Sequence, residues 1–207
     1  MAVFSFRTIS TPAEGSYKEK GSKFLAFAYP VENETDIKER ITLLKKQFFD
    51  ARHHCYAWVL GADRKHVRAA DDGEPNHSAG DPILGQIRSK ELTNVLVVVV
   101  RYFGGVKLGI GGLIAAYKTA AEDALNNAII LEKEVFASLR LIYDFSATPE
   151  VMKLVKEFSM SIIGESYNEK AEIDLRFPLR IENQIREKLQ ILTAMGAKIS
   201  VNDTVTE

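Results

Sequence analysis

The sequence has very little cysteine and no long apolar run. Cys55 is the single cysteine among 207 residues, so no disulfide can form within the chain. Such usage is typical of a reducing compartment, and we expect a cytoplasmic protein. The longest apolar run, residues 95–100, is far below the roughly 20 residues that a transmembrane helix needs. The N-terminus also lacks a signal-peptide pattern, so we expect no contact with a membrane.

A charge bias of either sign is also missing. The 27 Lys and Arg residues nearly balance the 28 Asp and Glu residues, and the formal net charge is −1. This balance excludes the strongly basic class of nucleic-acid-binding proteins. Any site for a polyanion must therefore be a local cationic patch.

Apolar periodicity predicts an α+β protein with two domains, 1–133 and 134–207, because a charged triplet at 132–134 interrupts the pattern. The first domain is expected to contain strands at 24–31, 53–60, 66–70 and 95–100, and helices at 35–49, 83–89 and 113–131. The second is expected to contain strands at 135–145, 162–167, 171–178 and 198–201, and helices at 149–158 and 182–195. The order βαββαβ in the second domain is the ferredoxin-like pattern.

The most informative segment is a buried strand that enters a glycine-rich loop and then a helix. The run VLVVVV at 95–100 is continuously apolar, which is typical of a strand covered on both faces. Five of the 13 glycines follow within nine residues: Gly104, Gly105, Gly109, Gly111 and Gly112. This density requires positive φ angles or the close approach of another group.

Two cations and the start of a helix make this loop a candidate anion site. Arg101 and Lys107 bracket the first two glycines, and the amides of the next helix lie beside the others. Backbone N–H groups, a helix dipole and fixed cations together favour an anion. The alternative is a tight turn whose glycines serve only close packing, because the helix that follows has an alanine-rich face.

Known nucleotide loops do not fit the 101–112 segment, and no cofactor is predicted. A P-loop needs Lys-Ser or Lys-Thr after its last glycine, but Ile110 follows Gly109. The Rossmann pattern fails because Ile114 stands where a third glycine belongs.

Arg52, His53 and Tyr102 are further candidate contacts for an RNA or anionic partner. Strand alternation places His53 and His54 on opposite faces, so one is expected in the core and the other at the surface. Adjacent strand residues cannot chelate one ion, and no metal site is predicted. Tyr102 offers an aromatic face for a base.

The acidic residues Asp71, Asp72 and Glu74 lie in a segment rich in turn residues. The spacing of a calcium loop is missing. Their carboxylates could hold the guanidinium of Arg52 or Arg101, and we favour this structural role over catalysis.

The run at 80–109, GDPILGQIRSKELTNVLVVVVRYFGGVKLG, resembles the signature of the IMPACT family, including its bacterial YigZ-type members. The upstream segments KGSKF, DARHHCYAWV and DDGEP occur in the order that this family shows. The resemblance implies a first domain folded like the second domain of a small-subunit ribosomal protein. It also implies a ferredoxin-like second domain similar to the late domains of elongation factor G.

The resemblance further implies a translation-linked binding protein without known catalysis. Eukaryotic relatives act in translational control, but they carry an additional partner-binding domain ahead of the shared one. We therefore expect a non-catalytic regulatory protein that binds RNA, the ribosome or a translation-associated partner through the 101–112 loop. Two alternatives stay open, namely a phosphotransferase that uses the same loop and a protein–protein adaptor. The sequence carries no signal for an oligomeric state.

Overall fold

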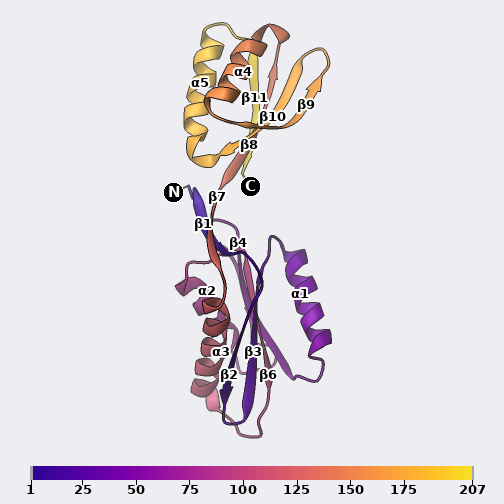
Figure 1. Ribbon diagram of the computed structural model, residues 1–207, viewed down its shortest axis with the longest axis vertical. Coiled ribbons are helices and arrows are strands. Elements are labelled where there is room, and N and C mark those ends of the chain that lie inside the picture. The colour runs from indigo at the N-terminus through magenta and orange to yellow at the C-terminus, as the bar shows by residue number, and fades with distance from the viewer. Residues whose placement is uncertain (1, 207) are drawn as a thin grey trace. The chain divides into compact units, whose positions relative to one another are not determined.

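The computed structural model describes residues 2–206, with side chains as far as residue 202. It contains two compact units, residues 6–133 and residues 134–206, and the second also includes residues 2–5. Both units combine helices with sheets (Figure 1), so the predicted α+β class is confirmed. Within the described chain, no helix is both long enough and apolar enough to span a bilayer.

The first unit is built on a five-stranded antiparallel sheet in the order β2-β3-β6-β4-β5. Its strands are β2 (Ala13–Glu19), β3 (Ser22–Pro30), β4 (His53–Leu60), β5 (His66–Ala70) and β6 (Val95–Tyr102). Helix α1 (Glu34–Gln47) covers one face, while α2 (Gly80–Ser89) and α3 (Gly109–Asn126) cover the other (Figure 1). A separate two-stranded sheet pairs β1 (Ser5–Ile9) with β7 (Ile130–Glu134).

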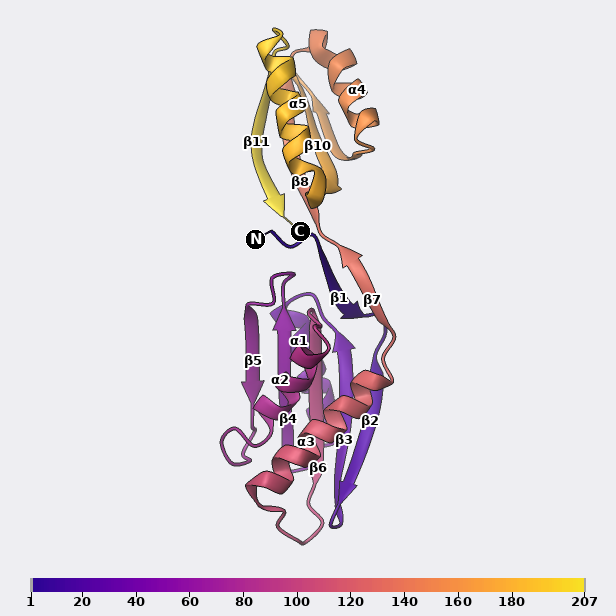
Figure 2. The ribbon, with the colours of Figure 1, turned by 90° about the vertical axis from the view of Figure 1, so that its left-hand side faces the viewer.

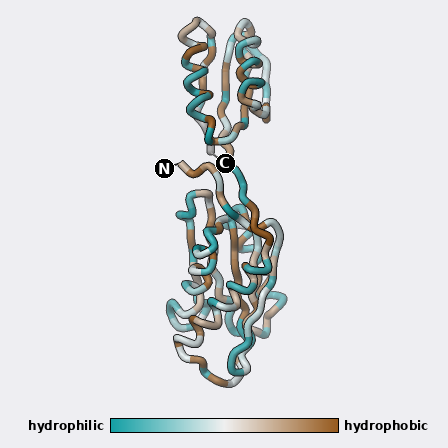
Figure 3. Tube along the Cα trace, turned by 60° about the vertical axis from the view of Figure 1, so that its left-hand side comes forward, coloured by the Kyte–Doolittle hydropathy of each residue, from teal (hydrophilic) through white to brown (hydrophobic). Residues whose placement is uncertain are grey.

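Strand β6 is the centre of two cores, which explains its unbroken apolar sequence. Val95, Val97 and Val99 belong to the cluster under α2 and α3, whereas Leu96 and Val98 belong to the cluster under α1. All five side chains are fully buried, and each such burial stabilises the fold by about 1.5–3 kcal/mol. The expectation that this strand is covered on both faces is confirmed. Figure 3 shows how hydrophobic and hydrophilic residues alternate along the helices that cover it.

Helix α1 is capped by a side chain at its start and carries basic residues at its end. Asn33 precedes the helix, and its side chain accepts hydrogen bonds from the backbone N–H groups of Thr35 and Asp36. Lys45 and Lys46 lie in the last turn, where positive charge complements the helix dipole.

Helix α3 packs unusually close to β2 because two backbones meet at Gly15. A Cβ atom at Gly15 would lie 2.2 Å from the backbone nitrogen of Ala124. Ala116, Ala120, Ala121 and Ala124 are fully buried on the same helix, so small side chains permit the approach.

The second unit has the ferredoxin-like order predicted from the sequence. Its elements are β8 (Phe136–Tyr143), η1 (Phe145–Ala147), α4 (Thr148–Glu157), β9 (Ser161–Tyr167), β10 (Ala171–Pro178), η2 (Leu179–Ile181), α5 (Glu182–Ala194) and β11 (Ile199–Thr206). The sheet order is β11-β8-β10-β9, with antiparallel pairing throughout. Gly196, at φ 98°, follows the end of α5 as a helix-stopping glycine.

Two local features differ from the expected elements. The polar stretch before residue 24, where no strand was expected, contains β2 and a tight hairpin to β3, with Lys20 and Gly21 at its tip. Both tip residues have positive φ (46° and 78°), as in type I′ turns. The bounds of the helix expected at 113–131 are wrong, because α3 occupies Gly109–Asn126 and the chain then enters β7.

We predict that Gly15→Ala lowers the free energy of unfolding by about 3 kcal/mol, because the new methyl group overlaps the α3 backbone. Gly85→Ala is the matched control, since Gly85 is an exposed α2 residue whose Cβ would meet nothing within 4 Å among the described residues. That change should stabilise by about 0.5–1 kcal/mol. Urea denaturation measures both, and equal effects of the two substitutions would contradict the close approach.

Candidate functional site

Several chain segments come together at one end of the five-stranded sheet. Strands β3 and β4 begin there and β6 ends there, because both neighbours run antiparallel to β6. Lys23 is thereby paired with Tyr102, and His53 with Arg101. The β2–β3 turn and the start of α3 lie at this same end (Figures 1 and 2), which we call the loop end of the sheet.

The last two residues of β6 face opposite sides of the sheet. Arg101 continues the row of Val97 and Val99 toward α2 and α3, whereas Tyr102 packs with the cluster under α1. The loop end therefore has two distinct faces, and the two candidate residues do not act on the same one.

On the α3 side, Arg101 forms a buried ion pair with Glu74. Its Nη1 donates to Glu74 Oε1 at 2.6 Å, and the two side chains are only 6% and 5% exposed. The hydroxyl of Tyr117, from α3, donates to the same Oε1 at 2.8 Å. The guanidinium carbon lies 5.4 Å from the ring centroid of Phe24 and 5.6 Å from that of Phe103. The pair thus ties β6, the 71–80 loop and α3 together.

This burial removes Arg101 from the predicted anion site and agrees with the other expectation, that an acid of the 71–74 segment holds its guanidinium. Glu74 neutralises the charge, and the fully buried Nε has no partner among the described residues. The burial of β6 includes Arg101, near its end. The acid that neutralises this buried charge, Glu74, lies 27 positions away in the sequence.

Cys55 extends the buried network. Its sulfur lies 3.3 Å from the Tyr117 oxygen and 3.0 Å from the backbone oxygen of Asp71. Burial raises the pKa of the Cys55 thiol and of the Tyr117 phenol far above their ordinary values. The thiol is therefore held in its protonated, unreactive form.

Asp71 and Asp72 hold the 71–80 loop in place. Asp71 accepts hydrogen bonds from the backbone N–H groups of His77, Ala79 and Gly80, where α2 begins. Asp72 accepts from the backbone N–H of His54 and from Lys45 Nζ. Burial acts to raise the pKa of both acids, but these bonds outweigh it and hold each pKa below its ordinary value.

The two histidines lie on opposite faces of β4. His53 is half-buried, with its Nδ1 2.9 Å from the backbone oxygen of Asp72. His54 is buried under α1, and burial lowers its pKa below the ordinary value. Neither side chain is part of a metal-ligand cluster in the described part of the chain.

The glycine-rich loop is anchored at its first glycine and open beyond it. Gly104 donates its N–H to Ser22 Oγ at 3.1 Å and lies against Gly21, so the loop is fixed to the β2–β3 turn. Gly105 and Gly109 have φ angles of 88° and 72°, and a Cβ at either would meet no described residue within 4 Å. Glycine at these two positions permits the positive φ angle and is not required for close packing.

The start of α3 is the open side of this loop. Gly111 and Gly112 fall in its first turn, which has neither a capping side chain nor an acidic residue in the described structure. Lys107 is exposed just before the helix. The exposed apolar side chains here are Phe103, Val106 and Ile110.

On the α1 side, three lysines gather at the hairpin, and sequence reasoning missed them. We call Lys18, Lys20 and Lys23 the hairpin lysines. Lys18 and Lys23 are directly opposite each other on β2 and β3, and Lys23 is directly opposite Tyr102 on β6. All three are exposed, and none forms an ion pair within residues 2–206. The segment KEKGSK carries the signal, but only the hairpin register brings these charges side by side.

The hairpin lysines and Tyr102 line a hollow of about 580 Å³. The Tyr102 hydroxyl donates to Asp50 Oδ1 at 2.8 Å, which fixes the ring and raises the pKa of the phenol. Arg52 is exposed just before the first paired residue of β4, and Phe49 nearby in the chain is 83% exposed. The hollow itself is lined by the three lysines, the single aromatic ring of Tyr102 and one acid, Glu19.

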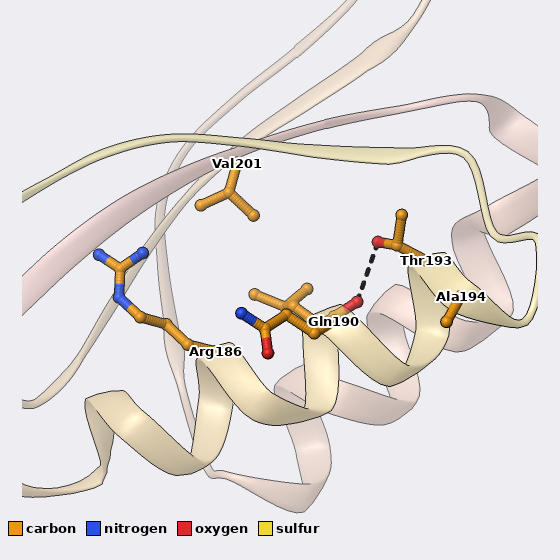
Figure 4. A pocket seen from close by; sticks show the side chains of 6 residues that line it. Arg186, Gln190, Thr193, Ala194 and Val201 are labelled. Carbon is orange, nitrogen blue, oxygen red and sulfur yellow. Dashed lines mark hydrogen bonds between the residues drawn. The ribbon is translucent and has the colours of Figure 1, made fainter.

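The second unit has a different kind of pocket, between α5 and β11 (Figure 4). Its volume is about 520 Å³, and Leu189, Ala194 and Val201 contribute to its mostly apolar lining. Arg186, at one end of the row of labelled side chains, donates to Glu182 at 2.8 Å. Because it offers no cluster of charges, we place the candidate site at the loop end of the first unit.

Comparison with known proteins identifies the family. Residues 20–125 match the model of the Impact N-terminal domain. The chain is 30% identical over 191 residues to the Bacillus subtilis IMPACT family member YvyE, covering 92% of this chain and 88% of that protein. The chain belongs to the IMPACT family.

Two further comparisons extend this result. The Escherichia coli IMPACT family member YigZ is 32% identical over 150 residues, covering 72% of this chain and 74% of its own. A crystal structure described as a hypothetical protein matches with a TM-score of 0.74 at 26% identity, covering 96% of this chain and 97% of its own. The resemblance to a bacterial YigZ-type protein is therefore confirmed. The matched residues 20–125 include Lys20, Lys23 and the glycine-rich loop, but they begin after Lys18.

We predict that Glu74→Gln lowers the free energy of unfolding by about 3–5 kcal/mol, because Arg101 is left as a buried charge without a counter-ion. The double variant Glu74→Leu/Arg101→Met should recover most of this loss, since no buried charge remains. Urea denaturation of the single and double variants measures both effects. A Glu74→Gln variant within 1 kcal/mol of the parent protein would show that the pair is not the anchor of the loop end.

Proposed function

We propose that this IMPACT family member is a non-catalytic, translation-linked regulatory protein of the cytoplasm that binds RNA, free or in the ribosome, at the loop end of its first unit. The observation that supports this most is the pairing of Lys18 directly opposite Lys23 without a carboxylate partner in the described chain. Like charges directly opposite on neighbouring strands destabilise a sheet. A phosphate between the two ammonium groups turns that repulsion into attraction.

Other groups at the loop end favour the same ligand. Lys107 and Arg52 are exposed cations on the segments that flank β6 and β4. The uncapped first turn of α3 adds backbone N–H groups and the positive end of a helix dipole. These features form a local patch on a chain whose net charge is −1, which suits specific placement better than binding over the whole surface.

The link to translation rests on family membership and on the ferredoxin-like second unit. Ribosomal RNA and messenger RNA both present closely spaced phosphates, so the same lysines would serve either form of the partner. Asp71, Asp72 and Glu74 are each engaged in holding the loop end together. This engagement favours binding over phosphotransfer, which would need acids available to a metal ion.

We predict that Lys18→Gln/Lys23→Gln weakens RNA binding and reduces its dependence on salt. Each lost phosphate contact should reduce the slope of log K against log salt by about 0.7, hence by about 1.4 for the pair. Fluorescence anisotropy with labelled RNA measures the slope, and co-sedimentation with ribosomes at rising salt checks the ribosome itself.

Lys38→Gln is the matched control for one neutralised lysine, because Lys38 is exposed on α1 at the end away from Lys45 and Lys46. It should leave both the affinity and the slope unchanged. An unchanged slope in the double variant would contradict RNA binding at this site. Capture of proteins from nuclease-treated lysate, with no binding to RNA, would assign the surface to a protein adaptor instead.

A further inference from the structure

We infer that the hollow beside the β2–β3 hairpin receives an unpaired nucleotide, so that the partner is single-stranded RNA, whose base stacks on Tyr102 while its phosphates contact the hairpin lysines. This inference rests on the RNA binding proposed above and specifies the form of RNA. It is carried by the position of one aromatic ring at the end of a row of two lysines that form no ion pair in the described chain, in a hollow that Glu19 also lines.

The geometry of the row suits one nucleotide unit. Lys18, Lys23 and Tyr102 occupy consecutive positions across β2, β3 and β6, and neighbouring strands lie about 4.8 Å apart. The hollow of about 580 Å³ falls within the range of roughly 300–1,000 Å³ that small-molecule sites occupy. A base and its phosphate can therefore lie against neighbouring strands without any change in the sheet.

Tyr102 is prepared for stacking. Its hydroxyl is held by Asp50, so the ring loses little conformational freedom when a base binds. The same hydrogen bond raises the pKa of the phenol, so the ring stays uncharged beside a phosphate. Phe49 precedes Asp50 in the chain, and its ring is 83% exposed.

Duplex RNA would contact the lysines but not the ring of Tyr102. Its bases are stacked inside the helix and present phosphates and groove edges, so the ring of Tyr102 would gain no partner. A single strand supplies a free base face for the ring and phosphates for Lys18 and Lys23. Stacking on one aromatic side chain changes affinity by about 5- to 150-fold.

The test compares an unstructured RNA strand of about 12 nucleotides, within the roughly 4–16 that one single-strand-binding OB fold covers, with a duplex of the same length. The full-length protein is titrated against each labelled RNA at several salt concentrations. We expect the strand to bind more tightly, and Tyr102→Leu to weaken it by about 5- to 150-fold without changing its salt slope. Tyr102→Phe retains the ring and should lose less affinity than Tyr102→Leu.

Tyr29→Leu is the control for loss of an aromatic ring. Tyr29 lies on the same face of β3 at the far end of the sheet, under Arg40 of α1, and outside the hollow. Its substitution should leave the affinity for the strand unchanged.

Each remaining outcome overturns a distinct statement. Equal binding of strand and duplex, with both weakened by Lys18→Gln/Lys23→Gln, would overturn the single-strand inference and leave RNA binding intact. Absence of binding to either RNA would overturn both. Displacement of the strand by a free nucleoside monophosphate, at concentrations near the strand's Kd, would assign the hollow to a small ligand and overturn the inference.

Discussion

The buried ion pair between Arg101 and Glu74 fixes the geometry on which the loop end depends. It holds the end of β6, just before the glycine-rich loop, against the 71–80 segment. The hydroxyl of Tyr117 joins α3 to the same carboxylate oxygen. A buried charge without its counter-ion would destabilise the fold strongly. The two segments therefore stay together unless both charged groups become exposed to water. The loop therefore leaves the sheet at a fixed point and turns into α3 with its first amides uncapped.

Strand alternation places Arg101 and Tyr102 on opposite faces of β6. Arg101 points toward α2 and α3 and holds the loop end together, while Tyr102 points to the other face, where it lies beside Lys23 of the hairpin. The type I′ hairpin brings Lys18 opposite Lys23 and holds Lys20 at a positive φ angle. A sheet that only had to be stable would not keep two lysines opposed without a carboxylate, and this local conflict is the physical reason to seek a ligand there.

Sequence patterns predicted the elements whose signal is local. The bounds of β4, β5 and β10 were predicted as the structure has them, since each is a short apolar or alternating run between turn residues. The ferredoxin-like order followed in the same way. β2 was missed because all its residues except Tyr17 are small or charged, and because a lysine occupies a turn position that usually holds asparagine or glycine.

The candidate site was harder to predict because it depends on pairings between distant residues. The glycine-rich loop was found from composition alone. The sequence offered Asp71, Asp72 and Glu74 as partners for Arg52 or Arg101 without choosing among them, and the structure pairs Glu74 with Arg101. The hairpin lysines required the register of β2 on β3, which a single sequence does not specify.

The most direct test of this account is the effect of Lys23→Glu on stability and on RNA affinity, measured on the same protein sample. A glutamate here faces Lys18 and replaces a repulsion by an attraction. The free energy of unfolding should rise by about 0.2–1 kcal/mol, while the affinity for single-stranded RNA falls. Unchanged RNA affinity in a variant of equal or greater stability would contradict the claim that the hairpin lysines serve binding.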